Sequence, residues 1–396
     1  MTRARKGRLA AALCVAALAA ACTGNGSPSP GPSSPTASPS PLVTQVKVAF
    51  LEDLSPEGAA SRVAPAFQGA KLAFDTAALT GDLLMQVRIV VLDTGGSAVT
   101  AGEAARQIAE DPSYVAAIGA PYLGYQGTLL EALDAAGVPF VTLSGLDGGL
   151  AASGWATFRR AVATQDQEAA VLAAYVDSLR SARDGVCLTG DGSRVGTTFL
   201  TAVASRLAAD VLVRQRILLT QDSAAALSHA VAASGCGAVV WGGFSAGAAA
   251  LERELVSAGL GKVHFVGDGG VKDATYLEVA ARSGDRTVVS CPCADLSTST
   301  ELAVQRFIQD YQADFGLPPG SYAAEAWDVA HMLLEAFRSG ATTREEVLAF
   351  LEEVVSYRGL ASTYVFSSDG DLEPQVATVY LYGDEDGRWL LLPPAD

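Results

Sequence analysis

The sequence has few of the residues that most catalytic, metal and nucleic-acid sites need. Its three histidines, His229, His264 and His331, lie far apart, and its Cys-Pro-Cys pair lacks the C-x-x-C spacing of zinc and redox sites. Lys and Arg number 27 against 43 Asp and Glu, which gives a formal net charge of −16. Phosphate backbones and anionic lipid surfaces repel so acidic a chain. No metal, cofactor or nucleic-acid partner is therefore expected.

A long apolar run is missing as well. The N-terminal run over residues 9–21 is shorter than the about 20 residues that a transmembrane helix needs, and it follows four basic residues within 3–8. A basic start, a short apolar core and small residues before a cleavage site are typical of a secretory signal peptide, here residues 1–21. A single N-terminal transmembrane anchor is the alternative.

The residues around the cleavage site indicate a lipid anchor. Ala19-Ala20-Ala21-Cys22 resembles the lipobox of bacterial lipoproteins, in which the cysteine becomes the new N-terminus and carries lipid. Residues 22–43 are rich in Pro and Ser, a composition that cannot bury a core and forms an extended tether. We therefore expect an extracytoplasmic protein that is anchored to the cell membrane through Cys22.

The other cysteines favour disulfides. Cys14 leaves with the leader, so that Cys187, Cys236, Cys291 and Cys293 remain, an even number in an oxidising compartment. Buried free thiols are the alternative.

From residue 46 onward, apolar strands alternate with helices, which predicts parallel sheets covered on both faces. The pattern runs to about residue 142 and restarts with a long helix over 163–183, so that we expect an α/β fold with two doubly wound lobes. The predicted strands are 46–51, 87–92, 115–119 and 138–142, and then 185–189, 211–219, 238–241, 263–266 and 287–290.

The alternation ends near residue 300. Helices are predicted over 301–315, 322–339 and 343–355, and residues 363–366 and 376–382 then read as a terminal hairpin or pair of strands around a Ser-Asp-Gly turn. Three consecutive helices do not extend a βα array. They fit a chain that crosses back between lobes.

One motif suggests an enzyme. Residues 243–247 match G-x-S-x-G between a strand and a helix, the setting of a hydrolase nucleophile at Ser245. A triad would need a later histidine, but His264 lies in a predicted strand and His331 inside a predicted helix. A glycine-rich turn without catalysis is the favoured interpretation. The turn over 190–196 lacks the ending of a phosphate-binding loop.

Polar turns follow several predicted strands, at the sheet edge where open α/β proteins bind ligands. Helices begin at the same edge, and their free N–H groups suit a carboxylate. The turns contain Ser55, residues 122–125, Ser144 with Gly145, Phe244 and Asp268.

Taken in order, several segments resemble type I periplasmic solute-binding proteins of the branched-chain amino acid class, which serve ABC transporters. The similarity runs from Val46 to Pro393 and rests on residues 46–51, 68–73, Asp93-Thr94, 117–119, 136–139, Phe158-Arg159, 322–328 and 366–370.

The resemblance implies two lobes joined by three hinge crossovers, near 153–158, 291–295 and 360–363, and a cleft that closes on ligand. It assigns 44–156 plus 295–361 to lobe 1 and 157–294 plus 362–396 to lobe 2. It also implies a monomer that delivers a small molecule, a hydrophobic or branched-chain amino acid, to an ABC transporter permease. A receptor or sensor for another small organic solute is the alternative, and a serine hydrolase using Ser245 is less favoured.

We expect the polar turns to line the cleft that the resemblance implies, with the ligand-binding residues Ser55, Tyr122, Gly124, Tyr125, Ser144, Gly145, Phe244 and Asp268. Leu123 and Leu146 occupy the positions of two hydroxyl side chains that hold a ligand carboxylate in amino acid-binding members. In the family topology the strands near Cys187 and Cys236 are neighbours, so that a bond between them is expected. A Cys291–Cys293 bond would stiffen a crossover, although a bond across one residue is strained.

Overall fold

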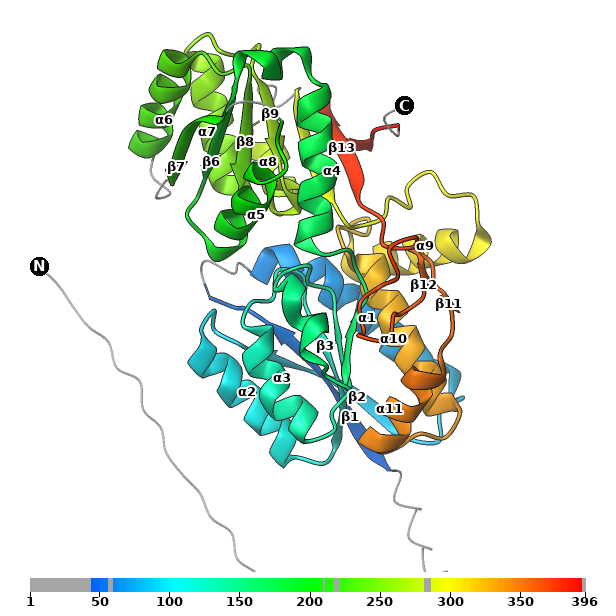
Figure 1. The fold of residues 1–396 in the computed structure, drawn as a ribbon. Coiled ribbons are helices and arrows are strands. Elements are labelled where there is room, and N and C mark those ends of the chain that lie inside the picture. Colours follow the sequence, from blue (N-terminus) through cyan, green and yellow to red (C-terminus); the bar gives the residue numbers. More distant parts are fainter. Residues whose placement is uncertain (1–43, 56–59, 209–210, 217–220, 281–285, 394–396) are drawn as a thin grey trace, which may run out of the picture. The chain divides into compact units, whose positions relative to one another are not determined.

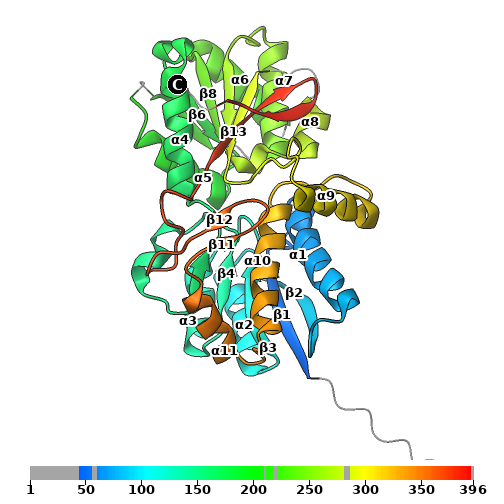
Figure 2. The same cartoon turned by 90° about the vertical axis from the view of Figure 1, so that its right-hand side faces the viewer.

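The computed structural model describes residues 44–55, 60–208, 211–216, 221–280 and 286–393. The predicted signal peptide and the whole predicted tether, including Cys22, lie outside these residues. Residues 43–396 form one compact unit with two main sheets (Figures 1 and 2). Within the described residues, no helix combines the length and apolarity that a membrane span requires.

The first sheet, with the helices packed on it, forms lobe A. Its five parallel strands lie in the order β2-β1-β3-β4-β5, and their bounds are β1 Gln45–Glu52, β2 Gln86–Asp93, β3 Tyr114–Gly119, β4 Phe140–Thr142 and β5 Phe158–Arg160. The helices between these strands are α1 Ala60–Thr80, α2 Ala98–Glu110, α3 Gln126–Ala135 and the 3-10 helix η1 Gly148–Ser153.

Alternation along β1 explains why helices cover both faces of this sheet. Val48 and Phe50 belong to the core that includes α1, while Ala49 and Leu51 pack with the buried side of α2 and α3. Successive strand side chains point to opposite faces, so that an uninterrupted apolar strand must be buried on both.

The second sheet and its helices form lobe B, with strand order β14-β13-β10-β9-β8-β6-β7. The strands are β6 Val186–Gly190, β7 Val211–Arg216, β8 Ala238–Gly242, β9 His264–Gly267, β10 Thr287–Cys291, β13 Tyr380–Glu385 and β14 Arg388–Leu391. The helices are α4 Gln165–Ser178, η2 Arg180–Asp184, α5 Arg194–Ala204, α6 Gln221–Ser234, α7 Ser245–Ser257, η3 Gly269–Val271 and α8 Ala274–Ala280. Strands β6 to β10 are parallel, whereas β13 runs antiparallel to β10.

The three predicted C-terminal helices are present as α9 Leu302–Phe315, α10 Ala323–Arg338 and α11 Arg344–Glu353. Helix α10 packs along α1, which places this part of the chain back on lobe A (Figure 2). The chain therefore passes from lobe A to lobe B after β5, returns after β10, and passes to lobe B again before β13. The first passage follows Arg160, a few residues after the predicted crossover.

Of the two alternatives for residues 363–366 and 376–382, the hairpin is wrong, and two strands that do not pair with each other are present. β12 Thr363–Tyr364 pairs with β11 Tyr357–Arg358, and β13 instead pairs with β10 and β14. The Ser-Asp-Gly turn closes only a single bridge between Phe366 and Leu372. The hairpin at the end of the chain joins β13 to β14 through Asp386 and Gly387, both with positive φ.

Candidate ligand-binding site

The predicted site residues lie where parallel strands end. Tyr122, Gly124 and Tyr125 join β3 to α3, and Ser144 and Gly145 follow β4 in lobe A. Phe244 joins β8 to α7, and Asp268 follows β9 in lobe B. Because carboxyl ends of parallel strands share one edge, each lobe presents its residues as a group.

Side chains from the two groups touch. The rings of Tyr122 and Phe244 meet edge to face with centroids 6.0 Å apart, and Tyr122 makes the same kind of contact with Tyr322, at 5.8 Å. Leu146, Val195 and Phe244 form a buried apolar cluster with Tyr122 packed against it, which we call the cleft cluster. Apolar side chains from the two lobes thus contact one another here.

The two leucines that replace hydroxyl side chains have different surroundings. Leu146 belongs to the cleft cluster, whereas Leu123 packs in the core of lobe A beneath α3. The hydroxyl of Ser144 donates to the carbonyl of Leu123 at 3.1 Å and accepts the N–H of Leu146 at 3.2 Å. Ser144 therefore shapes the loop between these leucines.

Gly145 brings the backbone of lobe A close to α4. Its carbonyl accepts the N–H of Gln165 at 2.8 Å, and a Cβ placed on Gly145 would lie 2.8 Å from the carbonyl oxygen of Ala163. A side chain there would push the two segments apart.

Ser55 lies at the end of β1 beside the turn after β2, with its Oγ 3.2 Å from where a Cβ on Gly96 would be.

A charged pair bridges the lobes beside the start of α3. Asp147 accepts the N–H of Gln126 at 3.3 Å and pairs with the guanidinium of Arg194, the first residue of α5. That guanidinium also stands over the ring of Tyr125, 5.2 Å from its centroid. A Cβ on Gly124 would come within 3.1 Å of Arg194, so that glycine leaves room for it. A hollow of about 370 Å³ adjoins this pair and is lined by Tyr125, Gly127, Thr128, Asp147, Gly149, Leu150, Ser153 and Arg194.

Two carboxyl groups are buried on the lobe B side. Asp268 is 2% exposed, and its oxygens accept the N–H groups of Gly243 at 3.2 Å and Gly270 at 3.0 Å. Glu168 on α4 accepts the N–H of Gly269 at 2.9 Å and the hydroxyl of Ser290 at 3.0 Å. Burial raises the pKa of both carboxyls, and the charge of Glu168 raises the pKa of Asp268 further.

Sequence reasoning missed Glu168, Gln165 and Arg194. Each lies in the first turn of a helix, and its role depends on what the other segments bring next to it. The sequence contains only a weak indication of Glu168, which is an acid on the same helix face as the apolar residues Leu172 and Val176. In the structure its side chain is buried with theirs.

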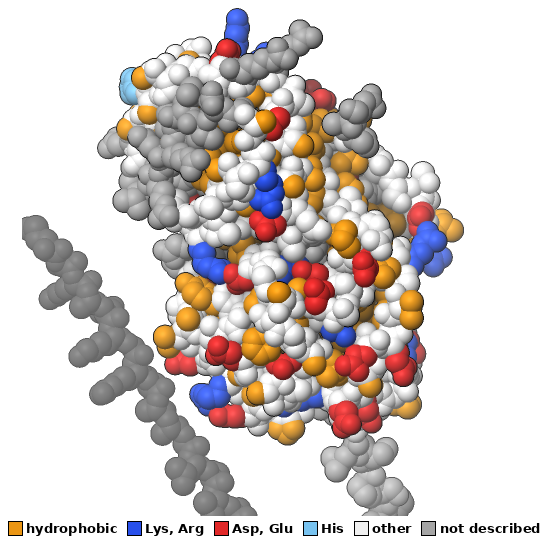
Figure 3. Space-filling view, in the orientation of Figure 1, with side chains coloured by type: hydrophobic (Ala, Val, Ile, Leu, Met, Phe, Trp, Pro, Cys, Tyr) orange, Lys and Arg blue, Asp and Glu red, His pale blue; other side chains and the backbone are white. Residues whose placement is uncertain are grey.

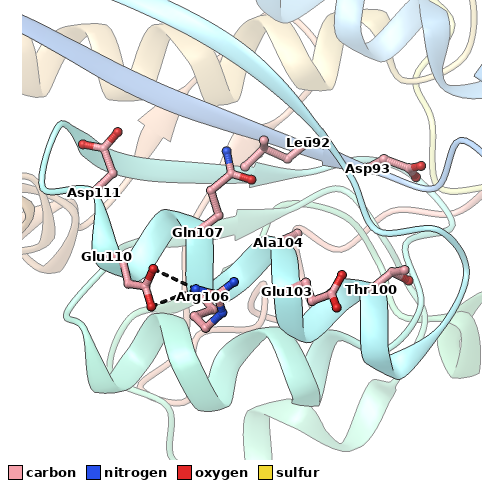
Figure 4. Close-up of a pocket in the computed structure, with 9 residues that line it drawn as sticks. All are labelled: Leu92, Asp93, Thr100, Glu103, Ala104, Arg106, Gln107, Glu110 and Asp111. Atoms are coloured by element: carbon pink, nitrogen blue, oxygen red, sulfur yellow. Dashed lines mark hydrogen bonds and ion pairs between the residues drawn. The ribbon is translucent and has the colours of Figure 1, made fainter.

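Larger hollows lie elsewhere on lobe A. One of about 540 Å³ lies between β2 and α2 and is lined by Leu92, Asp93, Thr100, Glu103, Ala104, Arg106, Gln107, Glu110 and Asp111 (Figure 4). Its charged side chains include the Arg106–Glu110 pair within α2. Another of about 410 Å³ involves Trp155, Arg159 and Asp369. On the face seen in Figure 3, Lys and Arg side chains stand singly among acidic ones.

Ser245, the residue of the hydrolase motif, is the first residue of α7. Its hydroxyl donates to Asp273 at 2.7 Å. His331 lies inside α10 against Trp327, with ring centroids 4.4 Å apart, and burial lowers its pKa to about 4. His264 begins β9. Among the described residues, no group of three or more His, Cys, Asp and Glu is arranged to hold a metal ion.

The four remaining cysteines are paired in the structure. Cys187 on β6 bonds to Cys236, which precedes β8, with Cα atoms 5.8 Å apart. Cys291 and Cys293 bond across Pro292, with Cα atoms 5.1 Å apart, where the chain leaves β10 for lobe A. The carbonyl of Cys293 accepts the hydroxyl of Tyr382 at 2.5 Å.

Comparison with known proteins fits this arrangement of two lobes. Residues 45–384 match the model of a family described as periplasmic binding protein. The fold is similar to that of the branched-chain amino acid transporter substrate-binding protein LivJ from Streptococcus pneumoniae, solved with isoleucine. That match has 18% identity, a TM-score of 0.77, and covers 89% of this chain and 100% of the other.

Two further structures are similar. The leucine-binding protein LivK from Thermotoga maritima has 17% identity and a TM-score of 0.74, over 88% of this chain and 98% of its own. A solute-binding protein of an ABC transporter from R. palustris was solved with benzoate. It has 18% identity and a TM-score of 0.73, over 88% of this chain and 95% of its own. No curated protein sequence matches the chain significantly.

The chain belongs to the periplasmic binding protein family, because the family model covers most of its length. The predicted fold class, with two parallel-sheet lobes of type I topology, is confirmed. Membership implies a place of action outside the cytoplasm.

Proposed function

We propose that this protein captures a small solute between lobes A and B and delivers it to the permease of an ABC transporter. The observation that carries the proposal is the contact of Tyr122 with Phe244, which joins the carboxyl edges of the two sheets at one point. Ligands of open α/β folds bind at that edge. The same geometry supports a binding role without catalysis, since Ser245 is hydrogen-bonded to an acid and its nearest histidines in sequence lie in a strand and a helix.

The solute is a hydrophobic or branched-chain amino acid. Tyr122, Leu146, Val195 and Phe244 offer apolar walls. The N–H of Gln126 is already accepted by Asp147, and the backbone N–H groups that follow it in the first turn of α3 are offered to a carboxylate. The similar LivJ was solved with isoleucine and another similar protein with leucine, which supports the choice. The runner-up is a larger or less charged organic solute, which the benzoate-bound relative favours. A receptor that senses such a solute would use the same site.

A thermal-shift screen of amino acids, short peptides, amides and sugars tests this assignment. A ligand at about a hundredfold excess over its Kd stabilises the folded protein by roughly 3 kcal/mol, which raises the melting temperature measurably. We expect leucine, isoleucine, valine or phenylalanine to do so. If all four leave the melting temperature unchanged, the amino-acid assignment is wrong, and uptake in a deletion strain separates transport from sensing.

We further propose that the mature chain is a lipoprotein, held at the membrane through Cys22 by the tether over residues 22–43. The leader, the cysteine and the Pro/Ser-rich tract support this. Cys22→Ser should release the protein into the medium or leave it unprocessed, as seen by cell fractionation and mass measurement. Unchanged membrane attachment of the variant would instead indicate a transmembrane anchor.

A further inference from the structure

The side chain of Glu168 reaches the point where the lobes meet. It is 7% exposed, and its Oε1 accepts the N–H of Gly269 at 2.9 Å. A Cβ placed on Gly269 would lie 3.4 Å from Oε1 of Glu168 and 3.2 Å from the hydroxyl oxygen of Tyr122. A helix of lobe B and a loop of lobe A thus bring a carboxylate and a phenol to one glycine.

Glu168 and its neighbour Asp268 differ in how their oxygens are used. Both oxygens of Asp268 accept backbone N–H groups, from Gly243 and Gly270, so that this carboxylate fixes the turn before η3. In Glu168 only Oε1 is used, by Gly269 and Ser290, and Oε2 has no hydrogen bond to any described residue. Glu168 therefore retains an accepting oxygen that Asp268 lacks.

The pair of acids has no compensating cation in the part of the chain that the structure describes. Neither Glu168 nor Asp268 forms an ion pair there with a lysine, arginine or histidine. Two buried carboxylates at one place oppose each other's ionisation, which agrees with their raised pKa values. A bound cation would relieve both the repulsion and the loss of solvation.

A second acceptor lies one turn earlier on the same face of α4. Gln165 is 6% exposed, its Nε2 donates to the carbonyl of Val195 at 3.1 Å, and its Oε1 has no hydrogen-bond partner. Because the carbonyl of Val195 can only accept, the atom of the Gln165 amide that faces it must be the nitrogen. The other atom of the amide, Oε1, is therefore an acceptor. Val195 belongs to the cleft cluster with Phe244, and residues at i and i+3 are neighbours on a helix.

We propose that α4 carries the subsite for a ligand's ammonium group, in which Glu168 Oε2 and Gln165 Oε1 accept its N–H donors. An ammonium has three donors and no acceptor, which matches a site that offers only acceptors. The rings of Tyr122 and Phe244 cover the adjoining apolar part of the ligand. The ligand class is a primary amine with an apolar body, and amino acids belong to it. This inference rests on the proposed function, because the ligand is the captured solute.

Three probes separate the two ends of such a ligand: leucine, 4-methylpentanoate, which lacks the amine, and 3-methylbutylamine, which lacks the carboxylate. Affinities are measured by calorimetry for the wild type and for Glu168→Gln, which keeps an oxygen for Gly269 and Ser290. We expect the variant to bind both amines about 10- to 100-fold more weakly, because a charge-assisted hydrogen bond is lost. Its affinity for 4-methylpentanoate should not change.

Glu252→Gln is the matched control, since Glu252 is another buried carboxyl, on α7, away from the cleft cluster. It should leave all three affinities unchanged. The inference is overturned if Glu168→Gln binds leucine as the wild type does, if 4-methylpentanoate binds the wild type as tightly as leucine, or if neither amine binds the wild type. The wild-type comparison of leucine with 4-methylpentanoate decides the matter even if Glu168→Gln fails to fold.

The outcomes also distinguish this inference from the proposed amino-acid ligand. If leucine binds Glu168→Gln as tightly as the wild type, the proposed function still holds and the proposed ammonium subsite is wrong. If 3-methylbutylamine binds through Glu168 while leucine, isoleucine, valine and phenylalanine do not bind, the subsite stands and the amino-acid assignment falls.

Discussion

At the scale of single residues, buried carboxyl groups divide into those with partners and those without. Asp328 on α10 accepts the N–H groups of Leu360 and Ala361 and the hydroxyl of Tyr364, and so holds the segment around β12 to lobe A. Glu325, one turn earlier, accepts the N–H of Ala294 at 2.6 Å, where the chain returns from β10. Both anchor passages between lobes. Glu252 forms no hydrogen bond or ion pair with any described residue, and burial raises its pKa to about 8.

Glu252→Gln should therefore stabilise the protein in a pH-dependent way. The folded state holds a proton on Glu252 that the unfolded state releases above about pH 4.5, the ordinary value. This group therefore lowers the unfolding free energy as pH rises from about 4.5 to about 8, with no further loss above that. The variant should gain roughly 1 to 4 kcal/mol at pH 8 and little at pH 4.5. Urea unfolding at both pH values measures this, with exposed Glu345→Gln as the control. An equal change at both pH values would contradict the account.

At the scale of elements, strands within a continuous apolar run were predictable from the sequence, and strands without such a run were not. The apolar alternation located β1 to β4, β6 to β10 and all the long helices, since burial on both faces leaves a continuous apolar run. β5 and β11 have only three and two residues, too few to show a period, whereas β12 lies within the predicted strand over 363–366. β14 was missed although Asp386-Gly387 is a recognised hairpin turn, because the Ser-Asp-Gly turn upstream was given that role.

The candidate site shows the same limit. The rule that ligands bind at the carboxyl edge of parallel strands pointed to Tyr122 and Phe244, which the structure brings into contact. It did not point to Glu168, Gln165 or Arg194. These residues lie in helices, and only the packing of the two lobes brings them next to the site. Whether these residues bind ligand stays a prediction.

At the scale of the whole molecule, the two lobes touch at several points besides the three connecting passages. Tyr122 meets Phe244, Asp147 pairs with Arg194, and Gly145 accepts from Gln165. The ion pair is partly exposed and contributes little to stability, as is usual for such pairs. Two sheet-based bodies joined by three chain passages are the arrangement in which hinge motion can close a cleft on a solute.

The most direct test of the central claim is a calorimetric titration of leucine into the wild type and Phe244→Ala. Phe244 is 7% exposed and packs against Tyr122 of the other lobe, so that its ring should cover a ligand held between them. Leu84→Ala serves as the control, because Leu84 is 85% exposed on lobe A. The account predicts one leucine per wild-type chain, at least about tenfold weaker binding by Phe244→Ala, and no change in Leu84→Ala. Leucine binding that is equally tight in Phe244→Ala would contradict a site between the lobes.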